Sequence, residues 1–304
     1  MNTSETNIEN QVAIQTIEQY AVGSVTSKDG TTIGYRQIGR GPGLILVQGA
    51  MGTAQNFTQL GQALADTFTV YVPDRRGRGL SGPSSGDSGV QKEVEDIQAM
   101  LVKTNACFIF GLSSGVIISL QALLSLRPIR KAAIYEPPLF VHGAPTALMI
   151  RYEKEMAEGR LAAALVTALQ ATQMGPQVSN VMPRWLLELL TDKAMVSQDK
   201  KAKIGDVTMR MLAPTLHNDF QIVAGMHGAL ERFQNIRVQV LLLGGSESPK
   251  FLKVDLDALE KILPHVTRVE FRGLGHSAAW NFDKQTNPHG NPIAVAQELQ
   301  RFFA

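Results

Sequence analysis

Apolar residues alternate along the chain between two patterns. Short apolar runs, such as residues 43–47 (GLILV) and 68–72 (FTVYV), are typical of strands buried on both faces of a parallel sheet. Between such runs, apolar residues recur every three or four positions, which predicts amphipathic helices. This alternation predicts an α/β fold with a doubly wound, mostly parallel sheet. The expected strands cover residues 21–26, 31–37, 43–47, 68–72, 107–110, 131–135, 238–243 and 268–271, and the expected helices lie within 57–64, 90–101, 114–126, 256–263 and 292–303.

One long segment breaks the alternation. Residues 139–236 contain helical patterns and no clear strand, and eight of the chain's 11 methionines lie there. Methionine adapts to irregular apolar surfaces, so these side chains either pack the helices together or line an apolar pocket. We therefore expect an N-terminal arm over residues 1–19, a core formed by residues 20–138 and 237–304, and a helical cap over residues 139–236.

Composition and charge narrow the class of protein. The 304 residues are 44% hydrophobic and 18% charged, which is typical of a globular protein with a large core. A net charge of +2 without a basic stripe argues against nucleic-acid binding. The single cysteine excludes an intrachain disulfide. We expect no signal peptide, no membrane span and a cytoplasmic location, because no basic start precedes an apolar block and no apolar run approaches about 20 residues.

The segment GLSSG, residues 111–115, lies between an expected strand and an expected helix. A strand, G-x-S-x-G and a helix together form a nucleophile elbow, in which a sharp turn exposes the serine at the carboxyl end of the sheet. Ser113 is therefore the candidate nucleophile. The two glycines leave out side chains that would clash in this turn, and the N-terminus of the following helix favours developing negative charge.

A serine hydroxyl needs a base and an orienting acid to act as a nucleophile. His276, in the loop that follows the last expected strand, is the candidate base. Two glutamates are candidate acids, because each follows an expected strand: Glu136 in YEPP and Glu247 in GGSESP. The structural alternatives for either glutamate are an exposed loop position or an ion pair, for example with the arginines of residues 75–78. We favour Glu247, whose strand is the last but one.

Two backbone N–H groups are expected to bind the oxyanion. One belongs to Ser114, the residue after the nucleophile. The other comes from the turn after the strand over residues 43–47, where Ala50 is the first choice and Met51 the second. We find no metal-binding motif and no complete nucleotide-binding glycine motif, and we expect neither a metal nor an organic cofactor.

With these residues in place, the chain from about residue 20 to 304 resembles the α/β-hydrolase superfamily. The resemblance rests on five motifs: QGAMG (residues 48–52), DRRGRGLSG (74–82), GLSSG (111–115), YEPP (135–138) and GLGH (273–276). It implies an eight-stranded sheet with an antiparallel second strand, a helical cap after the sixth strand, Ser113 as nucleophile and His276 as base. Many relatives have His-Gly in place of Gln48-Gly49. Those similar in the GGSESP and YEPP segments often lack an acid at the position of Glu247, which strengthens the case for Glu136 but leaves Glu247 the preferred acid.

These motifs favour a serine hydrolase that cleaves an ester, lactone or thioester of a small apolar molecule. Hydrolysis of a C–C bond, or cofactor-free perhydrolysis, is the enzymatic alternative on the same three residues. A receptor-like protein that binds a small ligand without turnover is the alternative of another class. Because one fold hosts many chemistries, the resemblance does not identify the substrate. The sequence leaves open whether the protein forms a homodimer.

Overall fold

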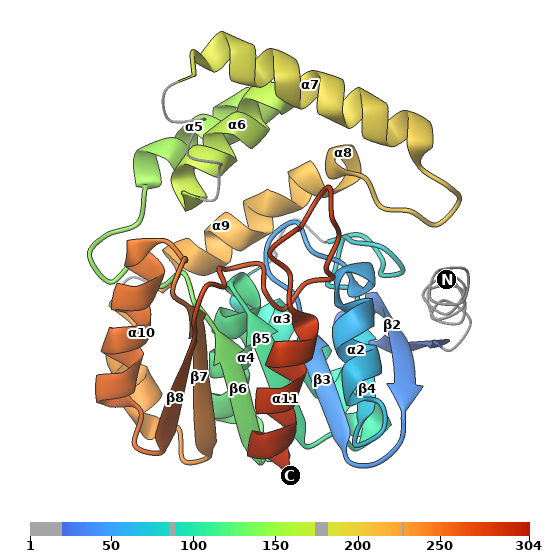
Figure 1. The fold of residues 1–304 in the computed structure, drawn as a ribbon, viewed down its shortest axis with the longest axis vertical. Helices are drawn as coiled ribbons and strands as arrows, with labels where there is room; N and C mark the ends of the chain where they lie inside the picture. The colour runs from blue at the N-terminus through green and yellow to red at the C-terminus, as the bar shows by residue number, and fades with distance from the viewer. Residues whose placement is uncertain (1–19, 85–88, 174–181, 227) are drawn as a thin grey trace, which may run out of the picture.

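A computed structural model describes residues 20–84, 89–173, 182–226 and 228–304 of the chain. The arm expected over residues 1–19 lies outside the described residues. Eight strands form one sheet in the order β1-β2-β4-β3-β5-β6-β7-β8 (Figure 1). β2 runs antiparallel to β1 and β4, and the other neighbours are parallel. The strands are β1 (Ala21–Thr26), β2 (Thr32–Gly39), β3 (Gly43–Val47), β4 (Thr69–Pro73), β5 (Phe108–Leu112), β6 (Lys131–Tyr135), β7 (Gln239–Gly245) and β8 (Val266–Phe271). The predicted fold class is confirmed.

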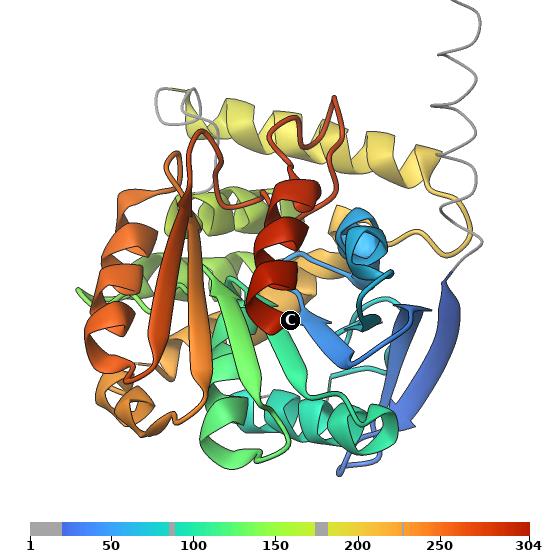
Figure 2. The ribbon, with the colours of Figure 1, turned by 60° about the horizontal axis from the view of Figure 1, so that its bottom comes forward.

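Helices cover both faces of this sheet (Figure 2). α2 (Thr58–Leu64), which follows the short η1 (Ala54–Phe57), and α11 (Pro292–Phe303) pack on one face. α3 (Val90–Thr104), α4 (Ser114–Ser125) and α10 (Lys250–Ile262) pack on the other. The central strands are buried along nearly their whole length, as their apolar sequences predict, because both faces are covered.

The described residues between β6 and β7 contain helices and no strand, as expected. Figure 1 shows the α-helices of this segment above the end of the sheet at which the parallel strands finish. None of the helices that the structure describes is long and apolar enough to cross a membrane. The inserted elements are α5 (Thr146–Ala157), α6 (Leu161–Thr172), α7 (Arg184–Lys201), α8 (Met209–Leu212), η3 (Ala213–Thr215), α9 (Leu216–Ala224) and η4 (Leu230–Asn235).

The inserted helices form two levels. α6 packs on both α5 and α7, whereas α9 packs on α4 of the core and lies between the sheet and the upper helices (Figure 1). Three methionines, Met149, Met195 and Met226, are buried in the core cluster, and Met211 is exposed. At least these three methionines therefore pack the helices together. Met174 lies outside the described residues.

Candidate active site

Ser113 occupies a strained turn between β5 and α4. Its backbone lies at φ 56° and ψ −127°, a region that residues other than glycine rarely adopt. Its N–H continues the sheet ladder by donating to the carbonyl of Tyr135 at 3.0 Å. A Cβ added at Gly111 would lie 2.6 Å from Ser119 Oγ, and one at Gly115 would lie 2.5 Å from the carbonyl oxygen of Val47. Both glycines of the motif are thus required by close packing around the serine.

His276 lies against Glu136. The distance between His276 Nδ1 and Glu136 Oε2 is 2.7 Å, and the other carboxylate oxygen, Oε1, accepts a hydrogen bond of 2.6 Å from the N–H of Gly245. Glu136 is fully buried, and it holds φ 51°, a second strained backbone at a strand end. Because Nδ1 faces the carboxylate, Nε2 is the ring nitrogen left to exchange a proton with a substrate or nucleophile.

This geometry corrects our preference for Glu247 as the partner of His276. Glu247 is exposed, and its Oε1 accepts a hydrogen bond from the hydroxyl of the adjacent Ser246 at 3.1 Å. The suggested pairing of either glutamate with the arginines of residues 75–78 is also wrong, since those arginines pair with aspartates and with Glu93.

Strand register explains why Glu136 reaches His276. Tyr135 pairs with Leu243 of β7, so Glu136 emerges beside Gly244, where a Cβ would lie 3.1 Å from Glu136 Oε1. The absence of side chains at the end of β7 leaves room for the carboxylate of the neighbouring strand. The phenol of Tyr135 donates to the carbonyl of Gly275 at 2.9 Å, which fastens the loop that carries His276 to the same strand.

The loop after β3 forms a turn with Ala50 and Met51 at its centre. The N–H of Gly52 donates to the carbonyl of Gly49 at 3.3 Å, and Met51 has φ 57°. In such a turn the N–H groups of the two central residues have no acceptor inside the turn. Ser114 is the first residue of α4, so its N–H also lacks an intrahelical acceptor and lies at the positive end of the helix dipole.

Two buried arginines contact this turn and the start of α4. Arg78 donates through Nη1 to the carbonyls of Gly49 and Gly52, at 2.7 and 3.1 Å. Arg75 lies beside it and donates to Ser114 Oγ at 3.2 Å. Both guanidinium groups bind Asp219 of α9, with distances of 2.7 Å for Arg75 and 2.6 Å for Arg78.

The sequence did not lead us to these supporting residues. The charged run at residues 74–78 follows a buried strand, and this placement was the available signal for buried arginines. Asp219 lies in a helical segment where nothing in the local pattern marks it as buried, yet it is 2% exposed.

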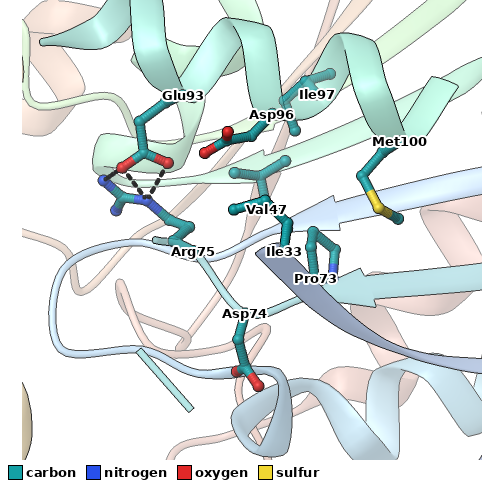
Figure 3. A pocket seen from close by; sticks show the side chains of 9 residues that line it. All are labelled: Ile33, Val47, Pro73, Asp74, Arg75, Glu93, Asp96, Ile97 and Met100. Carbon is teal, nitrogen blue, oxygen red and sulfur yellow. Dashed lines mark hydrogen bonds and ion pairs between the residues drawn. The ribbon is translucent and has the colours of Figure 1, made fainter. Parts of the chain in front are cut away.

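The charges of this cluster compensate one another. Burial opposes the charged form of Asp219, but the two arginines and the Ser114 hydroxyl outweigh it and hold the pKa of Asp219 below its ordinary value. Burial together with the nearby charge of Arg75 lowers the pKa of Arg78. Figure 3 shows Arg75 turned toward Glu93 of α3, beside a cavity of about 10 Å³. That volume is about the space of one water molecule, so this cavity is no substrate site.

Comparison with known proteins identifies the family. The chain matches the model of the alpha/beta hydrolase family over residues 44–289. The chain belongs to the alpha/beta hydrolase family. It is 30% identical to an alpha/beta hydrolase from Sphaerobacter thermophilus DSM 20745 of solved structure, with a TM-score of 0.72 and coverage of 93% of this chain and 100% of that one. The resemblance drawn from the sequence motifs is confirmed.

Curated relatives match this chain over shorter stretches. It is 37% identical over 96 residues to the uncharacterized hydrolase YraK of Bacillus subtilis (strain 168), which is 30% of this chain and 35% of the relative. It is 37% identical over 93 residues to pyrrolizixenacetamide deacetylase of Xenorhabdus hominickii, which is 28% of this chain and 34% of the relative. The chain thus spans about a third of the length of the curated relatives it matches.

Proposed function

We propose that this hydrolase is a serine hydrolase that cleaves an ester, lactone or thioester of a small apolar molecule through an acyl-enzyme on Ser113. The observation that carries the proposal is the pairing of His276 Nδ1 with the buried Glu136 carboxylate at 2.7 Å, in a chain whose elbow serine has a strained backbone. Backbone strain of this kind gathers at functional sites. A relative named as a deacetylase supports acyl hydrolysis as the reaction class.

The residues would act in a fixed order. Ser113 Oγ attacks the acyl carbonyl while His276 Nε2 takes the hydroxyl proton, and Glu136 stabilises the resulting imidazolium. The oxyanion receives hydrogen bonds from the N–H of Ser114 and from that of Ala50, with Met51 as the alternative donor. His276 then returns the proton to the leaving oxygen or sulfur, and a water molecule activated by the same histidine releases the acid.

An apolar substrate is supported by apolar residues that lie close in sequence to the reacting groups. Met51 lies in the turn that would bind the oxyanion, and Leu274 precedes His276 by two residues. Phe140, which follows the YEPP segment, has φ 48° and stacks on Phe251 at 4.6 Å between ring centroids. We propose that the inserted helices cap this site and shape its acyl and alcohol pockets.

The test combines labelling with turnover. A fluorophosphonate probe should label Ser113, and a series of p-nitrophenyl esters of increasing acyl length should be hydrolysed. Ser113→Ala should abolish both, with a melting temperature close to that of the wild type, because a turn serine contributes little packing. An alanine variant that kept more than a few per cent of ester hydrolysis would refute the nucleophile. Absence of labelling together with tight binding of an apolar ligand would favour a receptor.

A further inference from the structure

One side chain of the inserted segment reaches the structures that surround the nucleophile. Asp219 of α9 is 2% exposed, and both of its carboxylate oxygens are used. Oδ1 lies 2.7 Å from Arg75 Nη1 and accepts a hydrogen bond of 2.6 Å from the hydroxyl of Ser114. Oδ2 lies 2.6 Å from Arg78 Nη2. A single carboxylate thus joins the inserted helix, the elbow and the arginine pair.

Each partner of Asp219 controls one side of the oxyanion site. Arg78 donates to the carbonyls of Gly49 and Gly52, and these two contacts set the orientation of the peptide groups between them, which include the N–H groups of Ala50 and Met51. The hydroxyl bond to Ser114 fixes the residue whose N–H would be the other donor. The two halves come from loops after different strands, β3 and β5, and they share Asp219 as a common anchor.

The buried charge of Arg78 requires Asp219 as its partner. Arg75 has a second acid partner, Glu93, at 2.7 Å, whereas Arg78 forms an ion pair with no acid other than Asp219 in the part of the chain that the structure describes. Arg78 is 2% exposed, and a buried cation that loses its partner is strongly destabilised. Without the carboxylate, Arg78 would be expected to move toward water and release the two carbonyls of the turn.

We propose that Asp219 is a positioning residue that holds both donors of the oxyanion site in place, so that the seating of α9 on the core determines catalytic competence. This inference rests on the proposed serine hydrolase. It concerns the geometry of the donors and not substrate binding in the ground state, because Asp219 and the side chains it binds, those of Arg75, Arg78 and Ser114, are buried.

The experiment compares Asp219→Asn with Asp96→Asn. Asp96 is a matched control, since it is also buried and also pairs with an arginine of the same run, Arg76, at 2.6 Å, but on the side of α3. For each variant kcat and KM are measured on one p-nitrophenyl ester per folded molecule, with the folded fraction taken from near-ultraviolet circular dichroism. The inhibition constant of a boronic acid, which forms a tetrahedral adduct on the serine, is measured in parallel.

We expect Asp219→Asn to lower kcat about 10- to 100-fold and to weaken boronic acid inhibition by a similar factor, with KM changed less than about threefold. Asp96→Asn should leave kcat per folded molecule and boronic acid inhibition close to the wild type. Equal kinetic effects in the two variants, or a loss confined to KM, would overturn the proposal. If the wild type is neither labelled by the fluorophosphonate nor able to hydrolyse the esters, the proposed function is wrong. If the wild type is active and Asp219→Asn is equally active, the positioning role of Asp219 is wrong and the proposed function stands.

Ser114→Ala tests the same idea if Asp219→Asn does not fold. It keeps the backbone N–H and removes only the hydroxyl that binds Asp219. We expect kcat to fall about three- to tenfold, as for the loss of one buried hydrogen bond, with the same weakening of boronic acid inhibition. Where both variants fold, the double variant should lose less than the product of the two single effects, because they act through one contact. An unchanged kcat in Ser114→Ala would contradict the elbow half of the proposal.

Discussion

Glu136 carries its carboxylate where water does not reach it, so protein groups must satisfy both oxygens. One oxygen accepts from the backbone of Gly245 and the other faces His276. A buried charge with two good partners is tolerated, whereas the same charge with one partner removed is costly. This pairing fixes the tautomer of the imidazole. We therefore expect catalysis to require the charge of Glu136 and not merely a side chain of its size.

Glu136→Gln should therefore lower kcat by about 10⁴-fold, the size of effect seen when a triad carboxylate becomes an amide that favours the wrong tautomer. Glu247→Gln should cost less than about tenfold, since Glu247 is exposed and surface interactions contribute little. Steady-state kinetics on one ester with both variants makes the comparison. The assignment fails if Glu247→Gln is the more damaging change, or if Glu136→Gln keeps a tenth of wild-type kcat.

At this scale the sequence points to those candidate residues that a local motif marks. Ser113 sits in a five-residue signature between a strand and a helix, and His276 follows the last strand in a glycine-rich loop. The acid was ambiguous, because Glu136 and Glu247 both follow core strands. What separates them is the space left by Gly244 and Gly245, and such packing between neighbouring strands cannot be seen from residue types along one segment.

Among the elements, the end of β7 decides how closely the His276 loop approaches the sheet. A Cβ added at Gly245 would lie 2.2 Å from the carbonyl oxygen of Leu274, a backbone atom that cannot turn aside. We expect Gly245→Ala to displace the loop, to destabilise the protein by about 1–3 kcal/mol and to lower kcat by about 10- to 100-fold. Kinetics and thermal melting of the purified variant measure both effects.

Gly225→Ala is the control for this change. Gly225 follows α9 with a helical backbone, and its added Cβ would meet its nearest neighbours at 3.4 and 3.5 Å, which is ordinary contact. This variant should keep kcat and melting temperature near the wild type. Should Gly245→Ala behave like Gly225→Ala, the close approach of the two loops is not what holds His276 in place.

The start of α10 shows where the hydrophobic pattern fails to predict the extent of a helix. The helix begins at Lys250, six residues before the start expected from the sequence. Its buried face includes Leu252, Leu256 and Leu259, but also Asp255, which interrupts the apolar stripe. Asp255 is buried because its two oxygens accept from the N–H groups of Phe140 and Val141, in the segment that follows Glu136. A polar residue with a distant backbone partner looks like a solvent-facing residue in the sequence.

Over the whole molecule, the sheet and its flanking helices could be predicted because strand and helix alternate regularly and the motifs fall at strand ends. The arrangement of the inserted segment could not. Its helical nature follows from the pattern, but the return of α9 to the core depends on a buried cluster that draws Arg75, Arg78 and Asp219 from distant positions. Such clusters link the stability of the molecule to pH, since each buried acid titrates differently in the folded and unfolded chain.

Asp219 and Asp96 should make the stability of the protein depend on pH in opposite directions. The pKa of Asp219 is lowered in the folded protein, because its arginines outweigh the effect of burial. Its carboxylate therefore stabilises the fold above the unfolded value of about 4, and this contribution is lost as the pH falls through the folded pKa. For Asp96, burial outweighs the pairing with Arg76 and raises the pKa, so the folded state binds the proton more readily than the unfolded chain.

We therefore predict two opposite trends as the pH falls from about 7 to about 3.5, a range that spans the ordinary aspartate pKa. The stability of the wild type relative to Asp219→Asn should decrease, because the wild type loses the charged partner of its arginines. The stability of the wild type relative to Asp96→Asn should increase, because protonation relieves the burial of a charge. Urea unfolding followed by tryptophan fluorescence at several pH values gives both differences. Two parallel trends would mean that the two arginine partners do not differ in the balance between burial and pairing.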